Sequence, residues 1–268
     1  MNTDLFFLKL GGSLITDKDS ANSARIDIIK QAAKEIRQAR EENPNFKLLI
    51  GHGSGSFGHY AAKTFGTRDG VSTDEQWQGF AQVWQAAHQL HTVVIMALQL
   101  EGLPVIGFAP SAAAIMREGK LVEWNVEPIR QALDHGLIPV VYGDVVIDQV
   151  RGGGILSTEE AFLYLGQEFA PSKVLLAASE PVFKDFPERK KIVAEINMGN
   201  LEDIRKTLSG GEGSDVTGGM LSKVEAAMQM AARGGEGQGP EVWIFSGMRV
   251  GQVQNGLLGR PEGTLIST

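Results

Sequence analysis

Two glycine-rich segments each follow directly on a short apolar run, and this pairing restricts the chain to a narrow group of folds. Leu5 to Leu10 is rich in bulky apolar residues and ends at Gly11-Gly12, while Phe46 to Ile50 precedes the glycines of 51–58. Short apolar runs bounded by glycine are typical of buried strands in a parallel sheet. The sequence therefore predicts two buried strands, each with a glycine loop at its end.

Helical patterns alternate with these and further strand-like runs along the chain. Residues 26–39 place apolar side chains at helical spacing with charged residues opposite, and a longer helical pattern covers 74–99. Ser157 and Glu160 have the spacing of a capping box, which predicts the start of a helix. Further strands are expected at 104–108, 137–142, 173–177 and 242–245. We expect an α/β fold, an open αβα sandwich with a mostly parallel central sheet.

Three local features complete the expected layout. Gly143-Asp144 favours a hairpin turn into a strand at 145–147. Leu265-Ile266 fits a last strand at the edge of the sheet. The chain of 268 residues is treated as one domain with a lobe boundary near residue 170, although no linker composition marks that boundary.

Composition argues against several classes of function. The formal net charge is −7, which gives no indication of a nucleic-acid partner. The absence of cysteine removes disulfides, thiolate metal sites and cysteine nucleophiles. The N-terminus lacks the pattern of a signal peptide, and the longest apolar runs are too short for a membrane span. We therefore expect a cytoplasmic location and no membrane partner.

The two glycine segments have the composition of anion-binding loops. Glycine lets backbone N–H groups approach a phosphate, and a helix that follows adds its positive end. Lys9 lies near the end of an apolar strand, where a cation needs an anionic partner. Two such loops suggest two phosphoryl groups face to face, as in a kinase for a small anionic acceptor.

A dinucleotide-binding oxidoreductase is a weaker alternative. Residues 53–58 read Gly-x-Gly-x-x-Gly, the fingerprint of that class. The fold would require a second strand soon afterwards, ending in an acidic residue. The chain instead continues with a polar, turn-like segment at 64–74 and then a long helical pattern.

Three further side chains are candidates for phosphate contacts. Lys18 lies close to the first loop, His59 lies where a helix is expected to begin, and Lys223 lies one turn into a helix after the small-residue turn 215–219. Each has an ordinary alternative, a solvated lysine or a structural histidine. His52, nearer to the strand, is expected to orient the second loop.

Three motifs together resemble the amino acid kinase superfamily, and within it the isopentenyl phosphate kinases. They are K-L-G-G-S-L-I-T-D-K at 9–18, H-G-S-G-S-F-G-H at 52–59 and D-V-T-G-G-M-L-S-K at 215–223, and Y-G-D-V at 142–145 also fits. The resemblance runs through nearly the whole chain in matching order. The histidine that ends the second motif separates this branch from acetylglutamate, aspartate and uridylate kinases. Fosfomycin kinase shares much of the pattern and is the nearest alternative.

The resemblance implies an activity, its cofactors and its site residues. The activity is ATP-dependent phosphorylation of isopentenyl phosphate to isopentenyl diphosphate, a step of isoprenoid biosynthesis, with Mg²⁺ accompanying ATP and no protein metal ligand assigned. It also implies a homodimer, an acceptor-binding lobe at 1–170 and a nucleotide-binding lobe at 171–268. The predicted catalytic residues are Lys9, Lys18, His59 and Lys223. The predicted nucleotide contacts are Lys9, Gly11, Gly12, Ser13, Ser54, Gly219 and Lys223. The predicted acceptor contacts are Gly53, Gly58 and His59 for the phosphate, and Phe80, Val83, Val145 and Ile155 for the hydrocarbon tail.

Two segments depart from the family pattern. The usual S-G-D is Ser157-Thr158-Glu159, and the usual D-V-D-G turn is Ala178-Ser179-Glu180-Pro181, so no base contact is assigned there. Glu159 either replaces the aspartate that organises the lysines or only favours the helix dipole. Asp144 either orients a lysine or serves as a turn residue. The alternatives that remain are a kinase for a fosfomycin-type phosphonate or another small monophosphate, and a nucleotide-binding sensor that has lost transfer.

Overall fold

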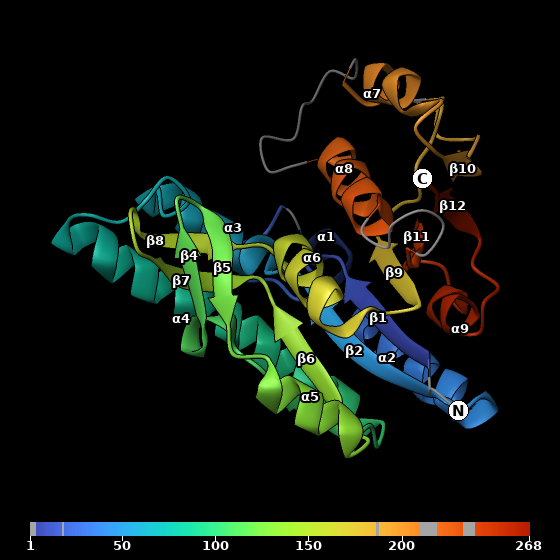
Figure 1. Cartoon of the computed structure of the whole chain (residues 1–268), viewed down its shortest axis with the longest axis horizontal. Coiled ribbons are helices and arrows are strands. Elements are labelled where there is room, and N and C mark those ends of the chain that lie inside the picture. The colour runs from blue at the N-terminus through green and yellow to red at the C-terminus, as the bar shows by residue number, and fades with distance from the viewer. Residues whose placement is uncertain (1–3, 18, 186–187, 210–218, 233–238) are drawn as a thin grey trace.

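An eight-stranded sheet forms the centre of the protein (Figure 1). The computed structural model describes residues 4–17, 19–185, 188–209, 219–232 and 239–268. The strand order is β10-β12-β11-β9-β1-β2-β6-β3. The strands are β1 (Asp4–Leu10), β2 (Phe46–His52), β3 (Val105–Gly107), β6 (Ile138–Tyr142), β9 (Lys173–Ala178), β10 (Glu195–Ile196), β11 (Glu241–Ser246) and β12 (Gly263–Ile266). Neighbouring strands from β11 to β3 are all parallel, which confirms the predicted mostly parallel sheet.

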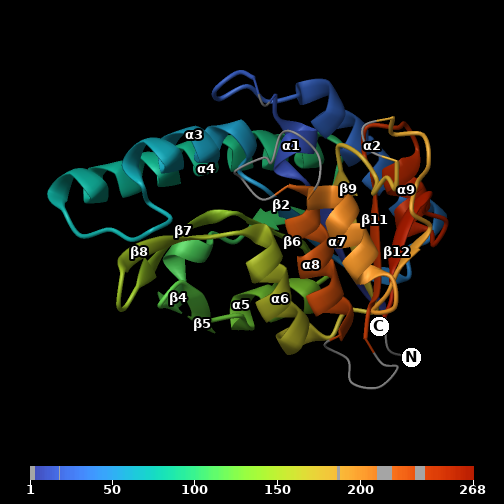
Figure 2. The ribbon, with the colours of Figure 1, turned by 90° about the horizontal axis from the view of Figure 1, so that it is seen from above.

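Helices cover both faces of this sheet. They are α1 (Gly12–Ile15), α2 (Ile26–Glu42), α3 (Gly55–Phe65), α4 (Asp74–Leu100), α5 (Glu127–Asp134), α6 (Thr158–Phe169), α7 (Leu201–Ser209), α8 (Met220–Ala231) and α9 (Gln252–Leu257), with a 3₁₀ turn η1 (Pro110–Ala112). Side chains alternate along β1: Phe6 and Leu8 join the apolar cluster of α2, whereas Phe7 joins that of α6 and α8. Figure 2 shows α1 to α4 on one side of the sheet and α5 to α8 on the other. The αβα sandwich is therefore confirmed.

A second, four-stranded sheet carries a correction to the sequence prediction. Its order is β5-β4-β7-β8, with β4 (Ala114–Arg117), β5 (Lys120–Trp124), β7 (Asp144–Asp148) and β8 (Gly152–Leu156). The predicted hairpin at Gly143-Asp144 is wrong, because β6 before it belongs to the large sheet and β7 after it to the small one. Gly143 is the crossing point between the sheets, and the antiparallel hairpin is β7–β8.

The last strand is also placed differently from the prediction. β12 does not form the edge of the sheet, because it pairs antiparallel with β11 on one side and parallel with β10 on the other. The edge is β10, which has two residues, Glu195 and Ile196. A strand of that length has no periodicity that a sequence could display.

Two helix predictions are confirmed in detail. Ser157 caps α6, with its side chain accepting from the Glu160 amide at 3.1 Å and the Glu160 carboxylate accepting from the Ser157 amide at 2.7 Å. The long pattern at 74–99 is α4, which begins at Asp74 and ends at Leu100. Within the described residues, none of the helices combines the length and apolar character needed to cross a membrane.

Candidate active site

The two glycine loops touch each other at the carboxyl ends of β1 and β2. The parallel register pairs Leu10 with His52, so the two strands end at the same level. A Cβ atom added to Gly12 would lie 2.6 Å from the backbone nitrogen of Gly55, and one added to Gly53 would lie 2.7 Å from the nitrogen of Gly12. Side chains do not tolerate such short contacts, so this direct backbone contact requires glycine on both loops.

Thr16 fastens the two loops together. It is fully buried at the end of α1, and its Oγ1 donates to the Gly12 carbonyl at 2.8 Å and accepts from the Ser56 amide at 3.0 Å. Gly55 takes a positive φ of 50°, and a Cβ there would lie 2.2 Å from Thr16 Oγ1. Thr16 could not be singled out from the sequence, because a threonine in a glycine-rich segment is ordinarily solvated.

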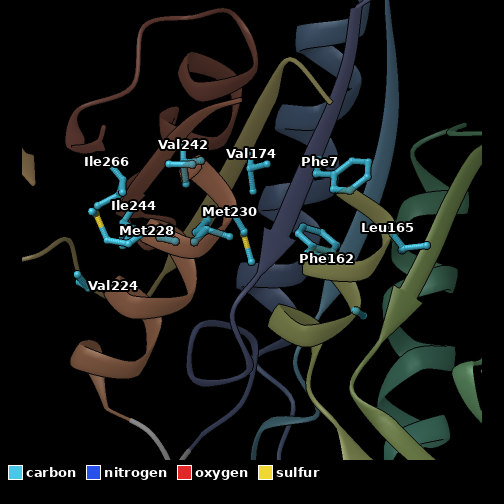
Figure 3. Packing of buried hydrophobic residues seen from close by; sticks show 14 of the residues in the cluster. Phe7, Phe162, Leu165, Val174, Val224, Met228, Met230, Val242, Ile244 and Ile266 are labelled. Carbon is cyan, nitrogen blue, oxygen red and sulfur yellow. The ribbon is translucent and has the colours of Figure 1, made fainter. Parts of the chain in front are cut away.

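Lys9 forms a buried ion pair with Glu159. Alternation along β1 places Lys9 on the same face as Phe7, and α6 covers that face. Phe162 of α6 packs on Phe7 with ring centroids 5.0 Å apart (Figure 3). One helical turn earlier, Glu159 accepts a hydrogen bond from Lys9 Nζ, and the Lys9 side chain is 7% exposed. The anionic partner that Lys9 was expected to need is thus supplied by the protein itself.

The charge of Glu159 reaches a second lysine. Burial raises the pKa of Glu159, but the charge and hydrogen bond of Lys9, together with the charge of Lys223, outweigh burial and leave that pKa below its ordinary value. Glu159 is therefore ionised at neutral pH. Lys223 lies in the first turns of α8, whose N-cap is Gly219. The ion pair with Lys9, with the charge of Lys223 acting on the same carboxylate, favours the interpretation that Glu159 organises the lysines. Lys18 lies outside the described residues.

The remaining loop residues sit at the starts of α1 and α3. Ser13 Oγ lies 3.5 Å from Ser179 Oγ, which follows β9. Ser54 is the N-cap of α3, and a Cβ on Gly58 would lie 2.5 Å from Ser54 Oγ, so the glycine makes room for that hydroxyl. His59 belongs to α3, but its side chain lies outside the described part of the chain.

The amides of Gly11 and Gly53 are already used within the fold. Gly11 donates to the Ala177 carbonyl at 2.8 Å, and Gly53 donates to the Leu10 carbonyl at 3.1 Å. These two hydrogen bonds tie the loops to β9 and β1. Contacts of either glycine with a bound phosphate stay predictions.

The four apolar residues predicted for a hydrocarbon tail come from one helix and one hairpin. Phe80 and Val83 lie one turn apart on α4, and Val145 and Ile155 are cross-strand partners in the β7–β8 hairpin. The pleat puts Gly153 on the same face of the hairpin as Ile155, and a Cβ on Gly153 would lie 2.8 Å from the Phe80 ring. The helix and the hairpin therefore meet where the Phe80 ring lies against Gly153.

Asp144 accepts hydrogen bonds from backbone amides at the junction between the two sheets. Its carboxylate is 1% exposed and accepts from the Ser111 amide at 3.0 Å and the Val145 amide at 2.9 Å. Burial raises the pKa of Asp144 despite these hydrogen bonds, which lower it. Asp144 is the first residue of β7, and these contacts hold the backbone where the chain passes from one sheet to the other.

A pocket of about 400 Å³ opens at the carboxyl ends of β9 and β11. Ser179 and Ser246 line it from these strand ends, and Arg189 and Arg249 line it from the loops around it. Both arginines carry acidic partners: Arg189 lies 2.9 Å from Glu180, and Arg249 lies 2.8 Å from a glutamate in the same lining. The pocket adjoins the first glycine loop through the Ser13–Ser179 contact.

Comparison with known proteins agrees with this architecture. The sequence model of the amino acid kinase family matches residues 4–246. The chain belongs to the amino acid kinase family. The segment Ser157-Thr158-Glu159, which departs from the family pattern expected from the sequence, lies at the start of α6. Its Glu159 carboxylate is paired with Lys9.

Several relatives and solved structures are similar over nearly the full length. The isopentenyl phosphate kinase of Methanocaldococcus jannaschii is 30% identical, with 98% of each chain covered. That of Methanothermobacter thermautotrophicus is 31% identical, with 98% of this chain and 99% of the relative covered. A crystal structure of an isopentenyl phosphate kinase superposes with a TM-score of 0.80 at 28% identity, covering 98% of this chain and 100% of the other.

Proposed function

We propose that this protein transfers the γ-phosphoryl group of ATP to isopentenyl phosphate, giving isopentenyl diphosphate and ADP. The observation that carries the proposal is the ion pair of Lys9 with Glu159 beside two glycine loops in backbone contact. The two archaeal isopentenyl phosphate kinases that match nearly the whole chain support the choice of acceptor. The apolar side chains between α4 and the β7–β8 hairpin suit a hydrocarbon tail and not a highly polar acceptor.

The proposed step joins two anions. An oxygen of the acceptor phosphate attacks the γ-phosphorus, and the bond from that phosphorus to the bridging oxygen of ADP breaks. The acceptor is already ionised at neutral pH, so the main requirement is charge neutralisation and alignment. In our proposal Lys9 bridges the donor phosphates, Lys18 and Lys223 stabilise developing charge, and His59 holds the acceptor phosphate. Mg²⁺ would accompany ATP, bound mainly through phosphate oxygens and water.

The predicted division of labour fits this scheme. We assign the acceptor to residues 1–170 and the nucleotide to residues 171–268, where the pocket beside Ser179 and Ser246 could receive the nucleoside. The nucleotide phosphates would lie between the two lobes, bordered by Gly11 and Gly12 from the first lobe and by Gly219 from the second. A homodimer and a cytoplasmic location belong to the same proposal, and light scattering tests the first of them.

A substrate panel tests the proposed function. Release of ADP would be followed with ATP and, in turn, isopentenyl phosphate, dimethylallyl phosphate, geranyl phosphate and fosfomycin. We expect kcat/KM to be highest for isopentenyl phosphate or its close isomer. A preference for fosfomycin would show that a phosphonate, and not isopentenyl phosphate, is the acceptor. If no phosphoryl group were transferred to any of these compounds, the protein would be a nucleotide-binding sensor.

Two variants test the assigned roles. Lys9→Ala should lower kcat by at least about 10²-fold, because it removes a preorganised cation from the transferring group. Lys34→Ala, which removes an exposed lysine on α2, is the matched control and should leave kcat unchanged. His59→Ala should abolish most turnover while the fold survives. Near-normal turnover of His59→Ala would overturn the acceptor assignment.

A further inference from the structure

Two buried histidines connect α4 to the second glycine loop. His52 ends β2 and is 0% exposed, and His91 of α4 is 6% exposed. His52 Nε2 lies 3.0 Å from His91 Nδ1, and His52 Nδ1 lies 3.2 Å from the Gly53 carbonyl oxygen. These contacts form a chain of hydrogen bonds from α4 through one imidazole to the backbone of the loop.

The direction of each hydrogen bond follows from the Gly53 carbonyl, the last acceptor in this series. A carbonyl oxygen can only accept, so His52 Nδ1 carries the proton and donates to Gly53. His52 Nε2 is then the acceptor, and His91 Nδ1 must be the donor. Burial lowers the pKa of His52 to about 4, although the Gly53 hydrogen bond raises it. Burial, together with the repulsion that a protonated His91 would meet from a protonated His52 or His88, lowers the pKa of His91 to about 3. Both rings are neutral at pH 7, and a neutral His52 leaves Nε2 able to accept from His91.

The rings have little freedom to move. Tyr142 stacks on both, with its ring centroid 4.2 Å from that of His91 and 5.5 Å from that of His52. On another side, a Cβ added to Gly107 of β3 would lie 2.3 Å from His91 Nε2. Close packing on these sides holds His91 at the distance that its hydrogen bond needs.

Both peptide groups around Gly53 are thereby fixed. In the first, the His52 carbonyl accepts from Thr158 Oγ1 at 2.7 Å, and the Gly53 amide donates to Leu10 at 3.1 Å. In the second, the Gly53 carbonyl accepts from the His52 ring. A peptide group is planar and trans, so holding the Gly53 carbonyl also sets the direction of the Ser54 N–H, at the N-cap of α3.

We propose that His91 is a positioning residue for phosphoryl transfer: by donating to His52 it fixes the His52 tautomer, and His52 in turn holds the Gly53–Ser54 peptide in the orientation that receives the acceptor phosphate. This inference rests on the proposed function, because it assigns the second glycine loop to the acceptor. The sequence assigns His91 no role, since a histidine within an amphipathic helix gives no sign of its partner across the fold.

A matched pair of variants separates the hydrogen bond from ring packing. His91→Phe keeps a ring against Tyr142 but removes the donor, whereas His91→Asn keeps an N–H donor close to the position of Nδ1 but loses the ring. We expect His91→Phe to raise the KM for isopentenyl phosphate about tenfold, the effect of one lost hydrogen bond, with the KM for ATP within about twofold. His91→Asn should stay within about threefold of the wild type for both.

Several results would overturn the inference. These are equal acceptor KM values in the two variants, an unchanged acceptor KM in His91→Phe, or a rise in the KM for ATP that matches the rise for the acceptor. The last pattern would show general damage to the fold and not a misplaced loop.

Nitrogen NMR of the wild-type protein tests the proposed hydrogen bonds of His52 even where a variant fails to fold. With ¹⁵N-labelled histidine, His52 should be protonated on Nδ1 and unprotonated on Nε2 at pH 7, and protonation on Nε2 would refute the proposal. Failure of the proposed function shows itself separately, as a wild-type protein that does not phosphorylate isopentenyl phosphate whatever the His52 tautomer.

Discussion

Replacing Glu159 by glutamine tests the buried ion pair at the candidate site. The side chains of Lys9 and Glu159 are 7% and 22% exposed, so removal of one charge leaves the other poorly solvated. Breaking a buried pair costs about 3–5 kcal/mol. Glutamine keeps an oxygen that can accept from Lys9 Nζ, and the site is partly open to solvent, so we expect a loss of about 2–3 kcal/mol. For a chain of this length that corresponds to about 4–12 °C in Tm.

The loss should depend on pH in a defined direction. The pKa of Glu159 in the folded protein lies below its ordinary value of 4.5, so folding favours the ionised form. The stability gained in this way is fully present above the unfolded pKa and is lost as the pH falls through the folded pKa. The difference between the wild type and Glu159→Gln should therefore be largest near pH 7 and should narrow below about pH 4.

Urea unfolding of the protein without nucleotide, measured from pH 7 to pH 3.5, provides the assay. Glu160→Gln is the matched control, because it makes the same chemical change one residue later on α6 and keeps the side-chain oxygen of the capping box. We expect that control to remain within about 0.5 kcal/mol of the wild type. An equal loss in both variants, or a Glu159→Gln loss that does not change with pH, would refute this reasoning.

Three further substitutions test the loop contact, an open helix position and a buried turn. Gly12→Ala should destabilise the protein by at least about 2 kcal/mol, because the added Cβ would lie 2.6 Å from a backbone nitrogen. Gly166→Ala, where no atom lies within 4 Å, should stabilise α6 by about 0.5–1 kcal/mol, and thermal unfolding that gives both changes the same sign would contradict the argument. Asp148 accepts four backbone hydrogen bonds, which outweigh the effect of burial and lower its pKa. Asp148→Asn should lose about 2 kcal/mol at pH 7, and denaturant titrations should show the loss fading as the pH falls through the folded pKa, which lies below the ordinary value of 3.8. A loss that stays constant down to about pH 2 would show that the charge is not its cause.

Much of the fold follows from patterns that are local in sequence. The runs before Gly11 and Gly51 predict β1 and β2, and the capping box at Ser157 predicts the start of α6, because side-chain alternation and helix capping act over a few residues. The small sheet was largely missed. Its strand β8 begins with three glycines, which no strand propensity favours, and the crossing at Gly143 has the composition of an ordinary turn.

The candidate site shows the same division. Glycine in both loops could be interpreted from sequence, since only glycine permits close backbone approach. The role of Thr16 could not be inferred from sequence, because it consists of hydrogen bonds that join one loop to the other. Glu159 was recognised as a departure from a family pattern, but its partner was not determined by that pattern.

The sequence by itself determined the alternation of strands, glycine loops and helices, since each depends on periodicity or on backbone sterics within a few neighbouring residues. Tertiary structure alone decided which charges and rings meet. Lys9 and Glu159 are 150 residues apart, and His52 and His91 are 39 apart. Their contacts exist because the sheet order and the docking of α4 and α6 bring them together, and no local pattern encodes either.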